Sequence, residues 1–82
     1  MTEFIYVYRL RSKREPRQVY TGLTDNLEAR LRTHNSGSVI HTAKFRPWTL
    51  EMALAFRSRE KAAAFETYLK SGSGREFARR HF

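Results

Sequence analysis

The order of strand-forming and helix-forming segments is the feature that most constrains this fold. Residues 4–10 and 18–24 are rich in the β-branched and aromatic residues that favour strands. Only a charged stretch that holds Pro16 separates them, so the two strands are expected to form a hairpin and pair antiparallel. Residues 48–56 alternate apolar side chains with polar or small ones, which predicts a third strand.

Three helices are expected, and the first two lie before and after the third strand. The first covers residues 26–34, with Asp25 as its N-cap and Glu28 completing a capping box. The second begins after Ser58, whose hydroxyl can cap it.

Glycines and basic residues mark the remaining segments. Gly72 and Gly74 are predicted to end the second helix, and residues 76–82 to form a short basic helix after it. Residues 38–47 are expected to be an irregular basic stretch. The resulting order, β-β-α-β-α-α, predicts an α+β fold in which helices flank a three-stranded antiparallel sheet, in one domain covering residues 1–82.

Composition excludes several classes of site. The chain has no cysteine, so it cannot form a disulfide framework, a cysteine-ligated zinc site or a thiol nucleophile. Its apolar runs are far shorter than the roughly 20 residues needed to span a bilayer, and no signal-peptide pattern opens it. A soluble cytoplasmic protein that is not bound to a membrane is therefore expected.

The charge balance points to a polyanionic partner. Lysine and arginine number 16 against 8 acidic residues, which gives a formal charge of +8. Nucleic acid is the first expectation, while an anionic membrane surface or an acidic protein is a weaker one. The simpler alternative is that many of these charges only keep a small domain soluble. The candidate nucleic-acid-binding residues are Arg9, Arg11, Lys44, Arg46, Lys70 and Arg75.

Three tyrosines and one helical face are candidates for a reactive site. Tyr6, Tyr8 and Tyr20 lie on adjacent predicted strands, and their phenols need water or a partner if they are buried. Arg30 and His34 are four residues apart, so they share one face of the first helix beside its apolar stripe. Most tyrosines in such places are core or hydrogen-bonding residues, so this pattern alone does not indicate catalysis.

One carboxylate, Glu66, borders the buried stripe of the second helix. A carboxylate in that place either pairs with an arginine or binds a hard cation such as Mg²⁺. The arginine pair is favoured from the residues alone, because ion pairs are commoner than metal sites built on one carboxylate. A zinc site is not expected, since His34 and His41 have no third ligand at metal spacing.

Taken together, these motifs resemble the GIY-YIG nuclease domain family, and its small stand-alone bacterial members most. Tyr6-Val7-Tyr8 stands at the first triplet and Tyr20-Thr21-Gly22 at the second. Residues 26–37 resemble the family's first helix, which carries an arginine and a histidine or tyrosine four residues later. Glu66 matches the glutamate of the later helix.

The resemblance implies a fold, an activity and a set of roles. The family's fold is a three-stranded antiparallel sheet flanked by helices, and its usual activity is Mg²⁺-dependent hydrolysis of DNA phosphodiesters, with Mn²⁺ as a possible substitute. Glu66 would hold the metal, Tyr8 or Tyr20 would activate the attacking water, Arg30 would stabilise the phosphoryl group, and His34 would assist proton transfer. The implied partner is DNA, including branched or damaged forms, with a partner protein or a homodimer as further options.

Departures from the family pattern leave alternatives open. Tyr6 replaces the first glycine, Leu23 stands where some members have a lysine, and no asparagine matches the one that larger members carry near the end. One alternative is a nucleic-acid-binding module of the same fold that has lost useful turnover. Another is an adaptor whose basic face docks on an acidic protein. The general base is also undecided: His34 titrates nearer to neutral pH than a tyrosine, although nearby positive charge could lower the pKa of Tyr8 or Tyr20.

Overall fold

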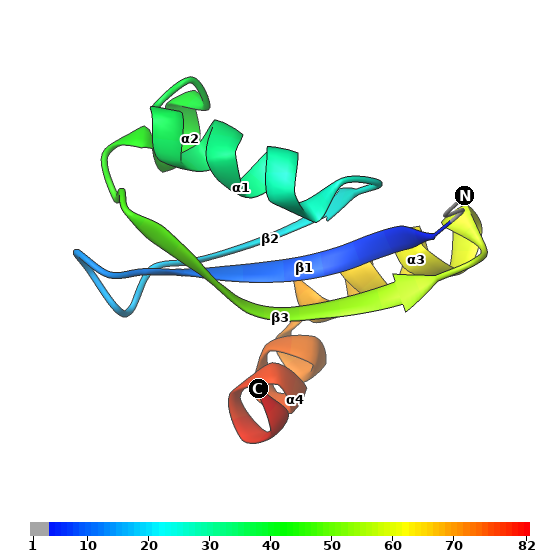
Figure 1. Ribbon diagram of the computed structural model, residues 1–82. Helices are drawn as coiled ribbons and strands as arrows, with labels where there is room; N and C mark the ends of the chain where they lie inside the picture. The colour runs from blue at the N-terminus through cyan, green and yellow to red at the C-terminus, as the bar shows by residue number, and fades with distance from the viewer. Residues whose placement is uncertain (1–3) are drawn as a thin grey trace.

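The computed structural model describes residues 4–82, so residues 1–3 of the predicted domain lie outside the described part. Its elements are β1 (Ile5–Ser12), β2 (Val19–Thr24), α1 (Leu27–Ser36), α2 (Ile40–Ala43), β3 (Trp48–Phe56), α3 (Arg59–Leu69) and α4 (Gly72–His81). The predicted α+β fold and its order of strands and helices are confirmed (Figure 1). The short helix α2 is an addition, within the stretch expected to be irregular.

The three strands form one antiparallel sheet in the order β2-β1-β3. Strand β1 is therefore central, and Tyr8 lies opposite Gly22 on one side and Ala53 on the other. The pairing of β1 with β3 is shifted between Arg9 and Leu10, so Glu51 is the extra residue of a β-bulge. This bulge bears directly on how Arg9 is held.

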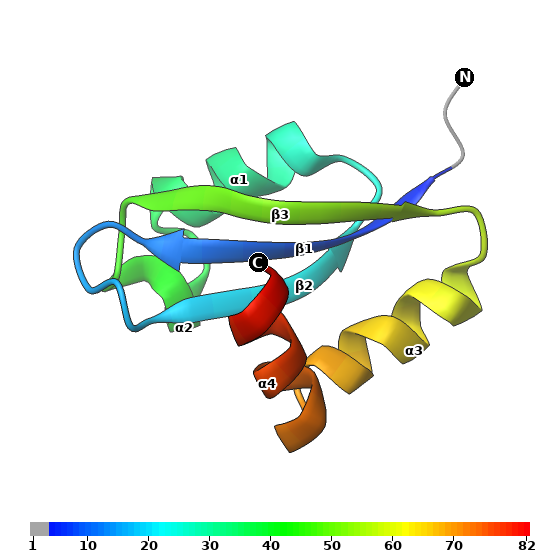
Figure 2. The same ribbon diagram turned by 90° about the horizontal axis from the view of Figure 1, so that it is seen from below.

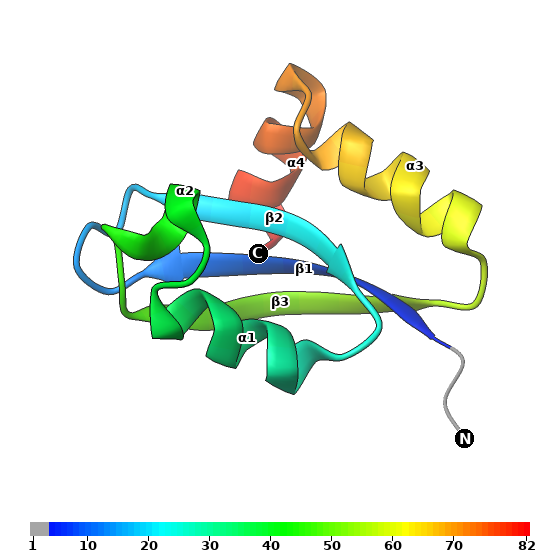
Figure 3. The same ribbon diagram turned by 90° about the horizontal axis from the view of Figure 1, so that it is seen from above.

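Helices cover both faces of the sheet. Figure 3 shows α1 and α2 in front of one face, and Figure 2 shows α4 in front of the other, with α3 running beside the sheet along β2. Successive residues of β1 point to opposite faces. Val7 packs with the core residues of α3 and α4, whereas Tyr8 and Leu10 pack with Trp48 and with the apolar side chains of α1.

The cap of α1 corrects a prediction. Asp25 is not the N-cap: strand β2 ends at Thr24, and the helix begins late enough that Asn26 occupies the cap. Its Oδ1 accepts a hydrogen bond from the Ala29 amide at 3.0 Å. The predicted cap of the later helix is confirmed, because the Ser58 hydroxyl accepts from the Lys61 amide at 3.1 Å.

The two late glycines do not end a helix as predicted. Helix α3 ends at Leu69, and Ser71 caps α4, which begins at Gly72 rather than near residue 76. Gly74 lies where α4 passes close to the end of α3, and a Cβ there would be 1.7 Å from the Tyr68 carbonyl oxygen. Gly74 therefore allows the two helices to approach closely and does not end a helix.

Replacing Gly74 with alanine is expected to lower the free energy of unfolding by about 2–3 kcal/mol, because the added methyl group forces α3 and α4 apart. The matched control is Gly72→Ala, where a Cβ meets no atom within 4 Å and the change should stay within about 0.5 kcal/mol. Urea unfolding of both variants measures the difference. Equal destabilisation by the two substitutions would show that helix propensity, and not the close approach, sets the effect.

Candidate active site

Four of the five predicted catalytic side chains come together on the face covered by α1. The Tyr8 hydroxyl lies 3.0 Å from Nε2 of His34, and Arg30 donates from Nε to the same hydroxyl at 3.3 Å. The Tyr20 ring packs on His34, with 4.6 Å between ring centroids. Strands β1 and β2 supply the phenols and α1 supplies the two basic side chains, as the shared helical face predicted.

Gly22 makes room for the Tyr8 hydroxyl. It lies directly opposite Tyr8 in the β1–β2 pair. A Cβ at this position would be 2.7 Å from the Tyr8 Oη and 3.0 Å from Cε2 of Tyr20. Any side chain here would displace the phenol from Arg30 and His34, which accounts physically for the glycine of the second triplet.

The hydrogen bonds of His34 assign its tautomer. The imidazole is fully buried, and its Nδ1 lies 2.9 Å from Oγ1 of Thr42 in α2. The Thr42 hydroxyl donates to the Val39 carbonyl, so Oγ1 is left to accept from Nδ1–H. Nε2 then has a free lone pair, which accepts the Tyr8 O–H.

Burial and the charge on Arg30 set the protonation states. Burial raises the pKa of Tyr8, although the hydrogen bond and charge of Arg30 oppose that rise. Burial, together with the Arg30 charge, lowers the pKa of His34, so the imidazole is neutral at pH 7. The hydrogen bond to Tyr8 raises the pKa of Arg30, which stays protonated. The result is a protonated phenol between a permanent cation and a neutral proton acceptor.

Glu66 lies apart from these four residues. It is half-buried on α3, the helix that runs beside β2, and its Oε2 pairs with the Lys70 ammonium at 2.8 Å. The favoured pairing with an arginine is therefore wrong in its partner, since a lysine one turn further along α3 takes that place. Within residues 4–82, no hydrogen bond or ion pair links Glu66 to Tyr8, Tyr20, Arg30 or His34.

The donor set around Glu66 suits one kind of metal ion only. In the part of the chain that the structure describes, no three His, Cys, Asp or Glu side chains gather as a metal cage. Mg²⁺ does not need such a cage, because it keeps several waters and binds through one or two carboxylates together with phosphate oxygens. A single glutamate whose Oε2 alone is paired fits that mode of binding and does not fit zinc.

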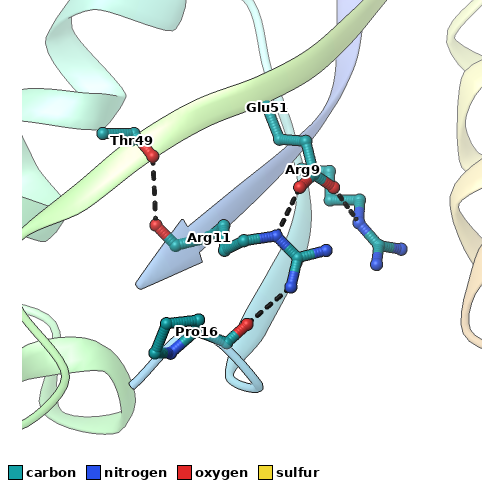
Figure 4. A network of polar contacts seen from close by, with 5 residues as sticks. All are labelled: Arg9, Arg11, Pro16, Thr49 and Glu51. Carbon is teal, nitrogen blue, oxygen red and sulfur yellow. Dashed lines mark hydrogen bonds and ion pairs between the residues drawn. The ribbon is translucent and has the colours of Figure 1, made fainter. Parts of the chain in front are cut away.

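The candidate nucleic-acid-binding residues of β1 are tied to one carboxylate (Figure 4). Arg9 and Arg11 bracket Glu51, with Nε–O distances of 2.6 and 2.5 Å. Burial alone would raise the pKa of Glu51, but hydrogen bonds from the two guanidinium groups hold it below its ordinary value. Arg11 also donates to the Pro16 carbonyl, so it holds the β1–β2 hairpin in place.

The other four candidates lie at two exposed places. Lys44 and Arg46 follow α2, where Arg46 donates from Nε to the Ala43 carbonyl at 2.8 Å. Lys70 and Arg75 flank the turn between α3 and α4. The structure thus separates the basic residues into one group near α2 and another near the α3–α4 turn.

Two polar residues of the site were not predicted from the sequence. Thr42 holds His34, and Asn35 fixes the end of α1 to β3 through hydrogen bonds with both the N–H and the carbonyl of Trp48. Thr42 lies in the stretch expected to be irregular, and neither residue belongs to a periodic pattern. Only the packing of α1 against α2 and β3 reveals them.

No helix within residues 4–82 is long and apolar enough to cross a membrane.

Comparisons with known proteins agree with this architecture. The GIY-YIG catalytic domain family matches residues 4–80. The chain is 38% identical over 69 residues to UPF0213 protein SH2523 of Staphylococcus haemolyticus, covering 83% of this chain and 82% of that protein. It is also 38% identical over 66 residues to UPF0213 protein CPE1444 of Clostridium perfringens, covering 79% and 69%.

A longer eukaryotic protein is similar as well. The chain is 39% identical over 75 residues to the structure-specific endonuclease subunit SLX1 of Debaryomyces hansenii, covering 83% of this chain. It spans only 22% of that yeast protein's length. The match over residues 4–80, and relatives at 38% identity that it largely covers, show that this chain belongs to the GIY-YIG catalytic domain family.

Proposed function

We propose that this protein is a metal-dependent endonuclease that hydrolyses DNA phosphodiester bonds. The observation that carries the proposal is the hydrogen-bonded series Arg30–Tyr8–His34, in which a cation and a neutral base both contact one phenol oxygen. Membership of the GIY-YIG catalytic domain family supports it. The name of the yeast relative, a structure-specific endonuclease subunit, suggests branched or otherwise structured DNA as the substrate.

The geometry suits proton transfer through Tyr8. As water attacks the phosphorus, the Tyr8 oxygen takes a proton from it and passes its own proton to Nε2 of His34. The positive charge of Arg30 stabilises the phenolate character that develops on Tyr8. In this scheme Tyr8 contacts the water, His34 is the final proton acceptor, and Tyr20 orients the imidazole by packing on it.

Arg30 has a second role in this scheme. Only its Nε donates to Tyr8, which leaves the terminal nitrogens of the guanidinium for the phosphate. Negative charge grows on the phosphoryl oxygens in the transition state, and a guanidinium that is always protonated stabilises it without a proton transfer.

Glu66 is the proposed holder of Mg²⁺, with Mn²⁺ as a substitute. When bound, such an ion supplies positive charge to the phosphate and to the leaving oxygen. Glu66 would contribute its carboxylate to the ion in place of, or beside, the present contact with Lys70.

The alternative function is a nucleic-acid-binding module of the same fold without useful turnover. The ion pair of Glu66 with Lys70, and its separation from the tyrosines, favour this second candidate. The two functions differ in one observable, metal-dependent cleavage.

Replacing Glu66 with glutamine is expected to lower Mg²⁺-dependent cleavage at least about 100-fold, because the neutral amide is a poor ligand for a hard cation. Supercoiled plasmid and a panel of branched, flapped and single-stranded DNAs serve as substrates, with EDTA in parallel reactions. The matched control is Glu60→Gln on the same helix, in its first turn, for which the rate should stay within about twofold.

Three outcomes separate the candidates. Cleavage that EDTA and Glu66→Gln both abolish supports the endonuclease. Cleavage that survives both changes contradicts the role of Glu66 and of the metal. DNA binding without cleavage of any substrate favours the binding module.

A further inference from the structure

We infer that a cavity between β2 and the α3–α4 turn binds a backbone phosphate of the nucleic-acid strand, next to the phosphate that is cleaved. That the phosphate belongs to a nucleic-acid strand rests on the proposed function. That the ligand is a phosphate rests on the residues of the cavity alone. The cavity has a volume of about 440 Å³. Arg9, Thr21, Lys70 and Arg75 line it together with Tyr20 and the apolar Val19 and Leu69.

The lining is strongly cationic. Arg9 of β1, Lys70 at the C-terminal cap of α3 and Arg75 of α4 bring three positive charges, and no acidic side chain of residues 4–82 lines the cavity. Lys70 forms an ion pair with Glu66, whereas Arg75 is exposed and has no ion-pair partner within residues 4–82. Glu51 and Glu66 pair with Arg9 and Lys70 from outside the lining, so the cavity keeps an excess of positive charge through Arg75, and that excess favours an anion.

Arg9 makes the cavity a shaped site rather than a patch of surface charge. Arg9 is only 9% exposed, and its Nε donates to Glu51, the extra residue of the β-bulge, at 2.6 Å. Its two terminal nitrogens point away from Glu51 (Figure 4) and have no partner within residues 4–82. Since no buried side-chain polar atom of the described chain lacks a partner, these nitrogens reach open space.

A guanidinium fixed in this way suits phosphate. Glu51 holds one edge of the Arg9 group, so the remaining N–H donors keep their direction without a loss of side-chain freedom on binding. Two parallel N–H groups match two oxygens of a phosphate. The apolar Leu69 beside them can contact a sugar, and the volume is within the range of sites for small organic groups, roughly 300–1,000 Å³.

The cavity connects the two separated parts of the candidate active site. Tyr20 lines it and packs on His34 with 4.6 Å between ring centroids. Lys70 lines it and pairs with Glu66. The cavity lies on the opposite face of the sheet from Tyr8, and β2 is the edge strand between them. A strand whose scissile phosphate lies beside Tyr8 and Arg30 would therefore pass round this edge at Tyr20 and present a neighbouring phosphate to Arg9 and Arg75.

Replacing Arg75 with glutamine tests the inference. Arg75→Gln should weaken binding of a fluorescein-labelled single-stranded 12-mer about tenfold and reduce the slope of log K against log salt by about 0.7, the value for one phosphate contact on a single strand. The matched control is Arg80→Gln, an exposed arginine on the same helix that does not line the cavity, with an expected change under about twofold. EDTA in every reaction keeps the DNA intact, and fluorescence anisotropy gives the affinities.

Inorganic phosphate tests the ligand chemistry directly. Titration into ¹⁵N-labelled protein should shift the Thr21 amide and the Arg9 Nε–H signals saturably, and Arg75→Gln should remove those shifts. The oligonucleotide should bind more tightly than phosphate. Equal affinities would overturn the strand assignment, because the cavity would then serve a small phosphate ligand.

The remaining outcomes separate this inference from the proposed function. Equal losses of DNA affinity in Arg75→Gln and Arg80→Gln overturn the cavity inference, since the overall positive charge of the protein would explain both. Cleavage by the wild-type protein would still support the endonuclease. If Arg75→Gln alone loses DNA affinity and the wild-type protein cleaves no DNA, the cavity is supported and the endonuclease proposal is overturned.

Discussion

Replacing Arg30 with glutamine should lower the single-turnover rate of DNA cleavage about 10³-fold, the scale of a stabilising arginine in phosphoryl transfer. The substitution removes the charge that holds the Tyr8 hydroxyl at 3.3 Å and that the phosphoryl oxygens would meet. Because the loss is confined to the transition state, the affinity for uncleaved DNA in EDTA should change only a few-fold.

Arg32→Gln is the matched control for this prediction. Arg32 lies on the same helix, is exposed, and within the described part of the chain makes one long ion pair, with Glu28 at 3.8 Å. Its replacement should leave the cleavage rate within about twofold, because exposed pairs of this kind contribute little. A comparable loss of rate in both variants would mean that α1 contributes general positive charge and that Arg30 has no special position.

Replacing Tyr8 with phenylalanine should lower cleavage by a factor of about 10² to 10⁴, the usual contribution of a positioned acid or base. The ring keeps its place in the core, but the oxygen between Arg30 and His34 is lost. Nε2 of the buried His34 then lacks a partner, so the free energy of unfolding should also fall by about 1–3 kcal/mol. Single-turnover kinetics and urea unfolding measure the two effects.

Tyr6→Phe is the control on the same strand, since within residues 4–82 the Tyr6 hydroxyl makes no hydrogen bond and its ring lies near that of Phe4. It should change neither quantity appreciably. Full cleavage activity in Tyr8→Phe would contradict the proton path through Tyr8 and leave Tyr20 or His34 as the direct partner of the water.

Much of the fold followed from local periodicity. Alternation along residues 48–56 and the aromatic content of residues 4–10 predicted strands that the structure confirms as β3 and β1. The boundaries were harder, because Asp25 and Asn26 are equally good caps and only the end of β2 decides between them. A glycine such as Gly74 is equally compatible with the end of a helix and with a close contact between two helices, so the sequence alone does not decide between these roles.

The candidate site divides in the same way. Tyr8, Tyr20, Arg30 and His34 could be brought together from sequence, because adjacent strands and an i, i+4 spacing are local rules. The role of Thr42 and the pairing of Arg9 with Glu51 could not, since each depends on a contact between elements far apart in the chain. The partner of Glu66 was mispredicted because Lys70, four residues further along and at the C-terminal cap of α3, pairs with it at 2.8 Å.

Tyr8 and Arg9 are consecutive residues on the central strand, and the pleat sends their side chains to opposite faces of the sheet. One peptide unit therefore carries the proton-transfer group on one side and the phosphate grip on the other. A one-residue insertion or deletion early in β1 would exchange the two, placing a guanidinium among the α1 side chains and a phenol in the cationic cavity. The hairpin loop can vary in length without this exchange, so changes of length should be tolerated there and rejected within β1.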